Sequence, residues 1–439
     1  MARIAGATGS HPSYAMRILV RTRPGTGIDA ARPAGRNIER ALSTRVVLWC
    51  ASRMDAAQSP PDTLVIGGGL IGCLCAYELA RRGQRVAIVE RGDLERESSW
   101  AGAGILSPIQ PWRYPGALSA LVNLSLARYD TLVPELLGAT GIDPQRRGCG
   151  MVIPVFAEDE WQELDPAAGW SERFGWVYER LDASQARTVE PALAADCLGA
   201  DYWPEVGQVR NPRLAAAARA ACTAAGVRFH THTEVIAFRR DGGRLTAAII
   251  PDGELTAGQF LLAAGAWSGG LGHALDLELP VAPVKGQILL LRTAPETIRR
   301  IVKHPAAYFV PRVDGRVLVG ATMERAEFDK TPTLWALRSL ANAAAFLLPC
   351  LDGAEVERQW AGLRPGTPDG LPYLGRAPGQ DNLFVATGHY RNGVVLAPAT
   401  AEVMAGLMSG AAPDIDLSPF AVGRPVPEEH PLGMPAAAP

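Results

Sequence analysis

The sequence predicts a mixed α/β fold (α+β in detail), in which a Rossmann-like nucleotide-binding domain is interleaved with a domain built on an antiparallel sheet. A short apolar run, Thr63–Ile66, leads into a glycine-rich loop at residues 67–72 and then into a helical stretch. This strand–loop–helix order is typical of a nucleotide-binding unit. Residues 280–330 instead alternate short strand-like runs, which indicates an antiparallel sheet. A length of 439 residues leaves room for both domains.

The composition excludes several broad classes of protein. There are 43 basic and 45 acidic side chains, and a net charge of −2 argues against a globally basic nucleic-acid binder. The seven cysteines are odd in number and lack metal-type C-x-x-C spacing, which favours a reducing, cytoplasmic compartment over a disulfide framework. The most apolar stretch, residues 64–80, contains four glycines and Glu78, so we expect no membrane span. His230 and His232 could share a strand face, but without further ligands we expect no metal site.

The charge is distributed unevenly along the chain. Residues 1–53 hold nine arginines but only Asp29 and Glu39, a net of +7 that leaves −9 to the remainder. The segment shows neither a helical nor a strand period, and arginines interrupt its apolar runs, unlike a secretory signal. We expect residues 1–61 to be a disordered or non-native extension, with translation starting at Met54. A targeting segment or a basic tail is the alternative.

The glycine-rich loop fits a dinucleotide. Gly67, Gly69 and Gly72 fill the pattern G-x-G-x-x-G, in which the first permits a tight turn, the second lets backbone approach a pyrophosphate, and the third allows close helix–strand packing. The pyrophosphate would face the N–H groups at the helix start. Residues 85–90 form the next strand, and its last residue, Glu90, stands where an acid binds a ribose hydroxyl. An acid rather than an arginine there argues against NADP.

Other segments have recognisable patterns. The small residues at 98–105 would let backbone amides press against an extended cofactor. Asn211 and Pro212 suit the first positions of a helix that runs to Ala225. We expect further helices at 73–82, 333–348 and 398–408, a hairpin at 235–239 and 245–250, and strands at 151–156, 227–231, 259–267, 287–292, 308–312, 316–319 and 383–386.

Three further stretches carry a resemblance to a known family. Residues 360–370, which read Trp-Ala-Gly-Leu-Arg-Pro-Gly-Thr-Pro-Asp-Gly, resemble the substrate-arginine segment of FAD-dependent amino-acid oxidases of the D-amino-acid oxidase and glycine oxidase type. Residues 388–398 resemble that family's C-terminal flavin motif, and residues 308–312 with 320–323 resemble its substrate-domain strands. The resemblance covers roughly residues 62–410. The spacing is most similar to the glycine oxidases of thiamine biosynthesis.

The resemblance implies a cofactor and a set of site residues. Arg364 would grip the substrate carboxylate, Tyr308 would donate a hydrogen bond to it, and Arg391 would lie near substrate and flavin. Because a flavin accepts hydride directly, no side chain is assigned as a catalytic acid or base. Gly362 stands where related sarcosine oxidases attach FAD through a cysteine, so we expect non-covalent FAD. The residues expected to contact FAD are Gly67, Gly69, Leu70, Ile71, Gly72, Glu90, Arg91, Ser98, Ser99, Ala103, Gly104, Ile105, Val235, Gly265, His389, Tyr390, Arg391, Asn392, Gly393, Val394 and Val395.

The two domains are expected to alternate along the chain. The FAD-binding domain would take residues 62–140, 205–275 and 356–412, and the substrate domain residues 141–204 and 276–355. Residues 413–439, rich in Pro and Ala, are expected to form a disordered tail.

These expectations define a leading function and two alternatives. The first is a glycine oxidase, with sarcosine or small D-amino acids as further substrates, that reduces O2 to H2O2 and supplies the glycine imine to a thiazole synthase. By analogy it would be a homotetramer, without nucleic-acid partners. The second is a D-amino-acid or sarcosine dehydrogenase that passes electrons to a quinone or partner protein. The third, more remote, is a non-catalytic flavoprotein accessory.

Overall fold

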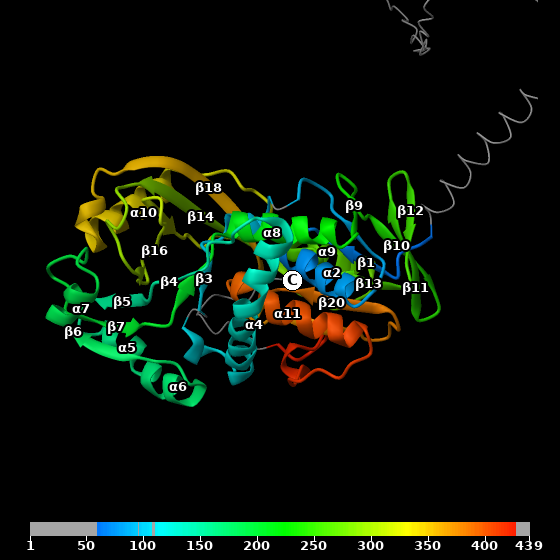
Figure 1. Ribbon diagram of the computed structural model, residues 1–439, viewed down its shortest axis with the longest axis horizontal. Coiled ribbons are helices and arrows are strands. Elements are labelled where there is room, and N and C mark those ends of the chain that lie inside the picture. The colour runs from blue at the N-terminus through cyan, green and yellow to red at the C-terminus, as the bar shows by residue number, and fades with distance from the viewer. Residues whose placement is uncertain (1–58, 95, 108–109, 427–439) are drawn as a thin grey trace, which may run out of the picture. The chain divides into compact units, whose positions relative to one another are not determined.

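The computed structural model describes residues 59–94, 96–107 and 110–426, and the account below concerns those ranges (Figure 1). The chain divides after Ser59, and the second unit, from Pro60, contains every element named here. The expectations for residues 1–58 lie outside the described residues.

One of the two large sheets has six strands and lies on one side of the described unit (Figure 1). Its order is β19-β20-β13-β1-β2-β9, and all neighbours are parallel except β19 with β20. The central strand β1 is buried at all four residues, as expected of a parallel strand covered on both faces. The bounds are β1 Thr63–Ile66, β2 Val86–Val89, β9 Arg228–His230, β13 Gln259–Leu262, β19 Tyr373–Arg376 and β20 Leu383–Thr387. This is the predicted Rossmann-like sheet, with an antiparallel strand at one edge.

Four helices lie together beside this sheet. Helix α2 (Leu70–Arg81) contacts both α8 (Asn211–Ala224) and α11 (Gly393–Met408), and α4 (Gly116–Thr140) packs across α8 and α11 (Figure 1). Helix α11 contains Pro398, which has no N–H to donate to the Val394 carbonyl. The Tyr129 hydroxyl of α4 donates to that carbonyl instead, at 2.7 Å. A contact from another helix therefore stabilises the interrupted helix.

The other large sheet has eight strands and lies on the opposite side of the described unit (Figure 1). Its order is β18-β14-β17-β16-β15-β5-β7-β6, with every pair antiparallel except β15 with β5. Helix α10 (Leu334–Leu347) packs on it through an apolar cluster that includes Leu340, Leu289 and Phe309. The bounds are β5 Met151–Val155, β6 Glu179–Asp182, β7 Gly199–Trp203, β14 Ala282–Arg292, β15 Ile301–Lys303, β16 Tyr308–Pro311, β17 Arg316–Gly320 and β18 Glu355–Gly366.

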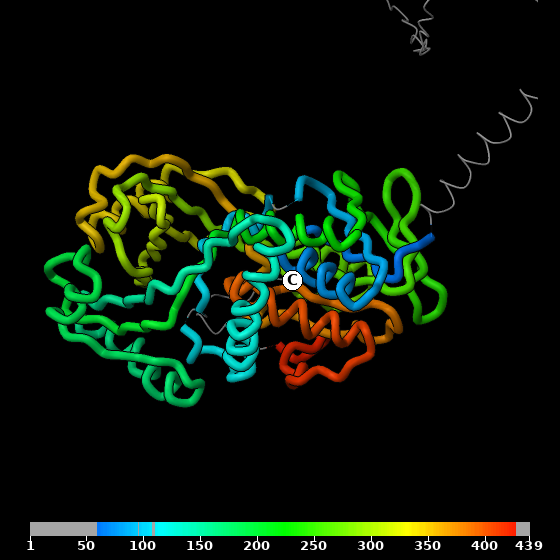
Figure 2. Tube along the Cα trace, in the orientation of Figure 1, coloured from blue at the N-terminus to red at the C-terminus, as the bar shows by residue number. Residues whose placement is uncertain are grey.

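The two sheets draw on alternating parts of the chain. Strands of the eight-stranded sheet come from residues 151–203 and 282–366, and those of the six-stranded sheet come from residues 63–89, 228–262 and 373–387. Figure 2 shows this alternation, because each side of the described unit contains segments of different colours and therefore of different positions in the sequence. The mixed α/β architecture is confirmed, whereas the individual domain boundaries remain a prediction.

Smaller elements complete the described unit. The predicted hairpin is present as β10 (Ala237–Asp241) and β11 (Arg244–Ile250), and a third strand, β12 (Gly253–Thr256), extends it. A second small sheet has the order β3-β8-β4. The remaining elements are β3 Ile105–Leu106, β4 Arg147–Gly148, β8 Gly207–Gln208, α3 Ser98–Ala101, α5 Glu160–Leu164, α6 Pro166–Phe174, α7 Ala183–Val189, α9 Ser268–Ala274 and the short 3₁₀ helices Pro111–Arg113, Gly265–Trp267, Pro349–Leu351 and Ser418–Phe420.

Several sequence-based bounds differ from the structure, including the strand predicted at 287–292, which begins at Ala282. Helix α2 begins at Leu70 rather than residue 73, and α11 begins at Gly393 rather than residue 398. Strand β13 ends at Leu262, after which the predicted strand to residue 267 becomes a 3₁₀ turn. For the two helices, a glycine or proline inside the element was taken as its limit, although tertiary contacts accommodate it. The predicted strand instead ran too far, through the turn at Gly265.

The C-terminal segment up to residue 426 differs from the expected disordered tail. Phe420 is completely buried, and Arg424 forms two hydrogen bonds to the carboxylate of Asp369, at 2.7 and 2.8 Å. Composition gave too much weight to Pro and Ala here, because one large apolar side chain and one buried ion pair hold the segment. Residues 427–439 lie outside the described residues. Within the described part of the chain, no helix is both long enough and apolar enough to span a membrane.

Candidate active site

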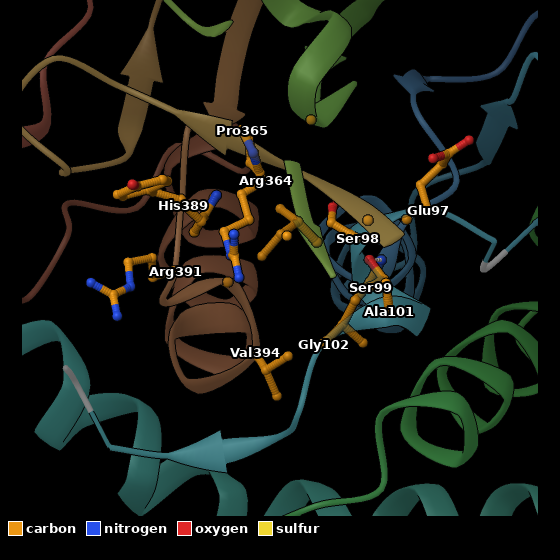
Figure 3. Close-up of a pocket in the computed structure, with 18 of the residues that line it drawn as sticks. Glu97, Ser98, Ser99, Ala101, Gly102, Arg364, Pro365, His389, Arg391 and Val394 are labelled. Carbon is orange, nitrogen blue, oxygen red and sulfur yellow. Dashed lines mark hydrogen bonds between the residues drawn. The ribbon is translucent and has the colours of Figure 1, made fainter. Parts of the chain in front are cut away.

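A cavity of about 580 Å³ runs from the glycine-rich loop after β1 to one face of the eight-stranded sheet. The close-up in Figure 3 shows Ser98 and Ser99 on one side of it, Arg391 on the other, and Arg364 between them. Every residue predicted to bind cofactor or substrate lines this cavity except Gly72, Asn392 and Val395. Segments far apart in sequence therefore converge on one site.

The nucleotide end of the cavity is built around the start of α2. Gly69 precedes the helix without any side-chain cap, and the first turn carries no acidic residue, so its backbone N–H groups suit an anion. The Leu70 N–H donates to the Ser99 hydroxyl at 2.9 Å. The Glu90 carboxylate accepts from the Gly68 N–H at 2.8 Å and from the Gly92 N–H at 3.0 Å. These contacts fix the loop that would carry the pyrophosphate and the acid that would meet the ribose.

Gly72 acts on the loop from outside the cavity. A Cβ atom at this position would lie 2.0 Å from the carbonyl oxygen of Gly67. Gly67 has a φ of +112°, which residues with a side chain rarely adopt. The third glycine of the motif thus permits the close approach of helix and loop, as its sequence position predicts.

An aromatic group beside the nucleotide end was not predicted. The Trp267 ring lies under the Arg91 guanidinium, 3.8 Å from the ring centroid, and stacks on Phe328 at 5.3 Å between centroids. Both Arg91 and Trp267 line the cavity. Arg91 was among the residues expected to contact FAD, but Trp267 was interpreted as the last residue of a buried strand, so no local pattern indicated its place at the cavity.

The residues present fit FAD. Three features suit a dinucleotide: the uncapped start of α2, a glycine loop in which an added Cβ would clash, and an acid at the end of β2. The cavity continues from there to the eight-stranded sheet. Among the described cysteines, none lines the cavity. A side chain at Gly362 would meet the Ala101 Cβ at 2.5 Å.

The far end of the cavity is defined by two side chains that lie against bare backbone. Arg364, on β18, rests against Gly286 of β14, where an added Cβ would be 2.2–2.4 Å from its guanidinium. Its Nη1 donates to the carbonyls of Thr322, at 3.1 Å, and Lys285, at 3.4 Å. Among the described residues Arg364 forms no ion pair with a carboxylate, so it can accept the carboxylate of a ligand as its counter-ion.

Tyr308 lies beside Arg364. It is on β16, directly opposite Gly320 of β17, and an added Cβ at Gly320 would lie 2.5 Å from the Tyr308 ring. Burial raises the pKa of Tyr308, although nearby Arg364 and Arg391 act in the opposite direction. The phenol therefore stays protonated at neutral pH and can donate a hydrogen bond to a bound anion.

The segment before α11 supplies the opposite wall. Arg391 lines the cavity, and burial lowers its pKa, with the neighbouring charge of Arg364 acting in the same direction. The buried His389 ring is 3.0 Å from the Thr400 hydroxyl, and burial lowers the pKa of His389 to about 3. The Tyr390 hydroxyl donates to the Met323 sulfur at 3.2 Å. His389 is thus a neutral structural group rather than a proton donor.

The sequence-based metal candidate finds no support in geometry. His232 lies 3.4 Å from the Asp93 carboxylate, and both side chains are largely exposed. In the described ranges, no cluster of three or more His, Cys, Asp or Glu side chains could hold a metal ion.

Comparison with known proteins identifies the class of protein first. A family model described as FAD dependent oxidoreductase matches residues 62–407. Glycine oxidase of Pseudomonas aeruginosa is 45% identical over 362 residues, 82% of this chain and 97% of that protein. The crystal structure of glycine oxidase from Geobacillus kaustophilus superimposes with a TM-score of 0.81 at 35% identity, over 84% of this chain and 100% of that one.

The chain belongs to the FAD-dependent oxidoreductase family and, within it, to the glycine oxidases. A further relative, the bifunctional protein ThiO/ThiG of Synechocystis, is 36% identical over 80% of this chain and 52% of that protein. FAD is accordingly the cofactor that the cavity accommodates.

The close approach at Gly72 gives a test of the cofactor site. We expect Gly72→Ala to bind FAD at least about 30-fold more weakly, because a displacement of the loop costs about 2 kcal/mol. Titration of the apoprotein with FAD, followed by fluorescence quenching, measures the Kd. Gly138→Ala is the matched control, since Gly138 is in a helix with nothing within 4 Å of an added Cβ. An unchanged Kd in Gly72→Ala would contradict this role.

Proposed function

We propose that the protein oxidises glycine, and more slowly sarcosine or small D-amino acids, with FAD as the electron acceptor and O2 as the final oxidant. The observation that carries this proposal is the pairing of Arg364 and Tyr308 on bare backbone at one end of a cavity whose other end suits a dinucleotide. The names of the glycine oxidase relatives support the choice of substrate.

The two side chains would orient the substrate. The guanidinium of Arg364 binds the carboxylate in place of the backbone carbonyls, and the Tyr308 hydroxyl donates to the same group. Together they fix the α-carbon at one place and hold its C–H bond in one direction. Bound FAD supplies the acceptor for a hydride, so alignment of this bond is the main contribution required of the chain.

Protonation of the amine is set before binding. The buried His389 is neutral and bonded to Thr400, so it is not available as an acid–base group. We propose that the amine enters in its neutral form, so that oxidation to the imine releases one proton to solvent. Hydrolysis of the imine would then give glyoxylate and ammonia.

The imine could also have a biosynthetic fate. The ThiO/ThiG relative supports a transfer of the glycine imine to a thiazole synthase in thiamine biosynthesis. We propose this transfer for the present chain as well, together with a homotetrameric assembly and a cytoplasmic location.

Replacement of Arg364 tests the proposed function. We expect Arg364→Ala to raise the KM for glycine about 100-fold, since a charge-assisted pair contributes about 3 kcal/mol, while FAD stays bound. Arg358→Ala on the same strand is the control, because Arg358 is exposed and outside the cavity. An O2 electrode with glycine, sarcosine and D-alanine gives the rates. Dye reduction without O2 uptake would indicate a dehydrogenase, and a flavin that no amine reduces would indicate an accessory protein.

The mode of FAD attachment has a separate test. Gly362 leaves no space for a linking side chain, and the cavity is free of cysteine within the described residues, so we propose non-covalent FAD. Acid precipitation of the holoprotein should release all the yellow colour into the supernatant. Flavin retained on the washed pellet would refute this proposal.

A further inference from the structure

The cavity contains a lysine that the proposed reaction does not use. Lys303 is the last residue of β15, and it is directly opposite Tyr308 in the register of β15 with β16. Directly opposite residues of antiparallel strands present their side chains on the same face of the sheet. Both residues line the cavity. Lys303 is therefore the neighbour of Tyr308 on the sheet, on the side away from Gly320 and Arg364.

Lys303 has no acidic partner in the part of the chain that the structure describes. The charged groups that act on the pKa of Lys303 are Arg391 and Arg113, which are also cations. The adjacent His304 is bound to Glu160 instead, at 3.0 Å. Burial, with the two arginines, lowers the pKa of Lys303 to about 7. Arg113 is paired with Glu163, so the cations that an anion in this part of the cavity would meet are Lys303 and Arg391.

The distribution of charge in the cavity is asymmetric. Its described carboxylates, Glu90, Glu97 and Glu234, also border the neighbouring surface hollow at the nucleotide end. The substrate end has Arg364, Arg391 and Lys303. Glycine brings one carboxylate, which can pair with one of these three cations. The substrate end is thus suited to a molecule with more than one anionic group.

We propose that Lys303 binds a second carboxylate, and that the protein prefers small dicarboxylic amines, in which one carboxylate pairs with Arg364 and the other with Lys303. This inference rests on the proposed function, because it assigns a substrate class to the same site. Tyr308 leans over Gly320, towards Arg364, and Lys303 lines the same cavity on the other side of Tyr308.

The oxidation of such an amine balances as for glycine. Iminodiacetate would lose two electrons and two protons to form the imine, and O2 would take them up to give H2O2. Water would then hydrolyse the imine to glyoxylate and glycine. The glycine released is itself a substrate under the proposed function.

Binding of unreactive ethers separates recognition from turnover. Diglycolate is iminodiacetate with the nitrogen replaced by oxygen, and methoxyacetate lacks the second carboxylate. Calorimetry on the FAD-loaded protein at pH 6 should give diglycolate at least about tenfold tighter binding than methoxyacetate, because a charge-assisted contact contributes a factor of this size. In Lys303→Met the ratio should fall to about two, whereas Lys303→Arg should retain the preference.

The pH dependence distinguishes a charged contact from a change of shape. The groups around Lys303 are Arg113 with its partner Glu163, Arg391, His304 with its partner Glu160, and Tyr308. Lys303 is charged below its pKa of about 7 and neutral above it, so the diglycolate preference should decline between pH 6 and pH 9. It should be flat in Lys303→Met and should persist at pH 9 in Lys303→Arg. Arg299→Met, which removes an exposed charge just before β15, should behave as the wild type.

Turnover completes the test and separates it from that of the proposed function. Iminodiacetate should exceed its mono-amide in kcat/KM in the wild type but not in Lys303→Met. If glycine is oxidised but diglycolate and methoxyacetate bind alike, the inference about Lys303 is wrong and the proposed function stands. If Lys303→Met loses glycine turnover with an altered pH profile, Lys303 acts on the amine proton and the inference is likewise overturned. If no amine reduces the flavin, the proposed function fails, whatever the binding ratio.

Discussion

The substrate end of this protein depends on the absence of side chains at Gly286 and Gly320. A Cβ atom at either position would occupy the space of the Arg364 guanidinium or the Tyr308 ring. Because the backbone is bare there, two polar side chains from different strands lie flat on the sheet and face the same cavity. A guanidinium and a phenol held in this way have little freedom left to lose when a carboxylate binds.

The cofactor end follows the same principle on the other sheet. Gly67 and Gly72 permit a helix and a loop to approach more closely than any side chain would allow, and the uncapped start of α2 then faces the cavity. The two ends are brought together because the chain crosses repeatedly between the sheets (Figure 2). The site is therefore a property of the interleaved topology, since neither sheet alone contains both ends.

The local motifs were predictable and the register was not. The glycine loop, Glu90 and the strand Thr63–Ile66 could be predicted because each depends on neighbours in sequence. Strand β18 was missed because Gly362, Pro365 and Gly366 are typical of a loop. It is an edge strand, paired only with β14, where a proline is tolerated.

Residues whose role depends on cross-strand pairing gave no signal in the sequence. Lys303 reaches the site only through its register with Tyr308, and Gly286 only through the side chain of Arg364. Trp267 similarly lies against the guanidinium of Arg91, which is far from it in the chain. The resemblance to amino-acid oxidases supplied Arg364, Tyr308 and Arg391, which composition and periodicity alone could not have singled out.

The central claim is that bare backbone at Gly286 positions Arg364 for the substrate carboxylate. The most direct measurement is the KM for glycine in Gly286→Ala, together with the Kd for FAD. We expect the KM to rise at least about 30-fold with the FAD affinity unchanged, because a displaced guanidinium loses about 2 kcal/mol of carboxylate binding. Gly169→Ala, where an added Cβ meets nothing within 4 Å, should behave as the wild type. An unchanged KM in Gly286→Ala would contradict the account.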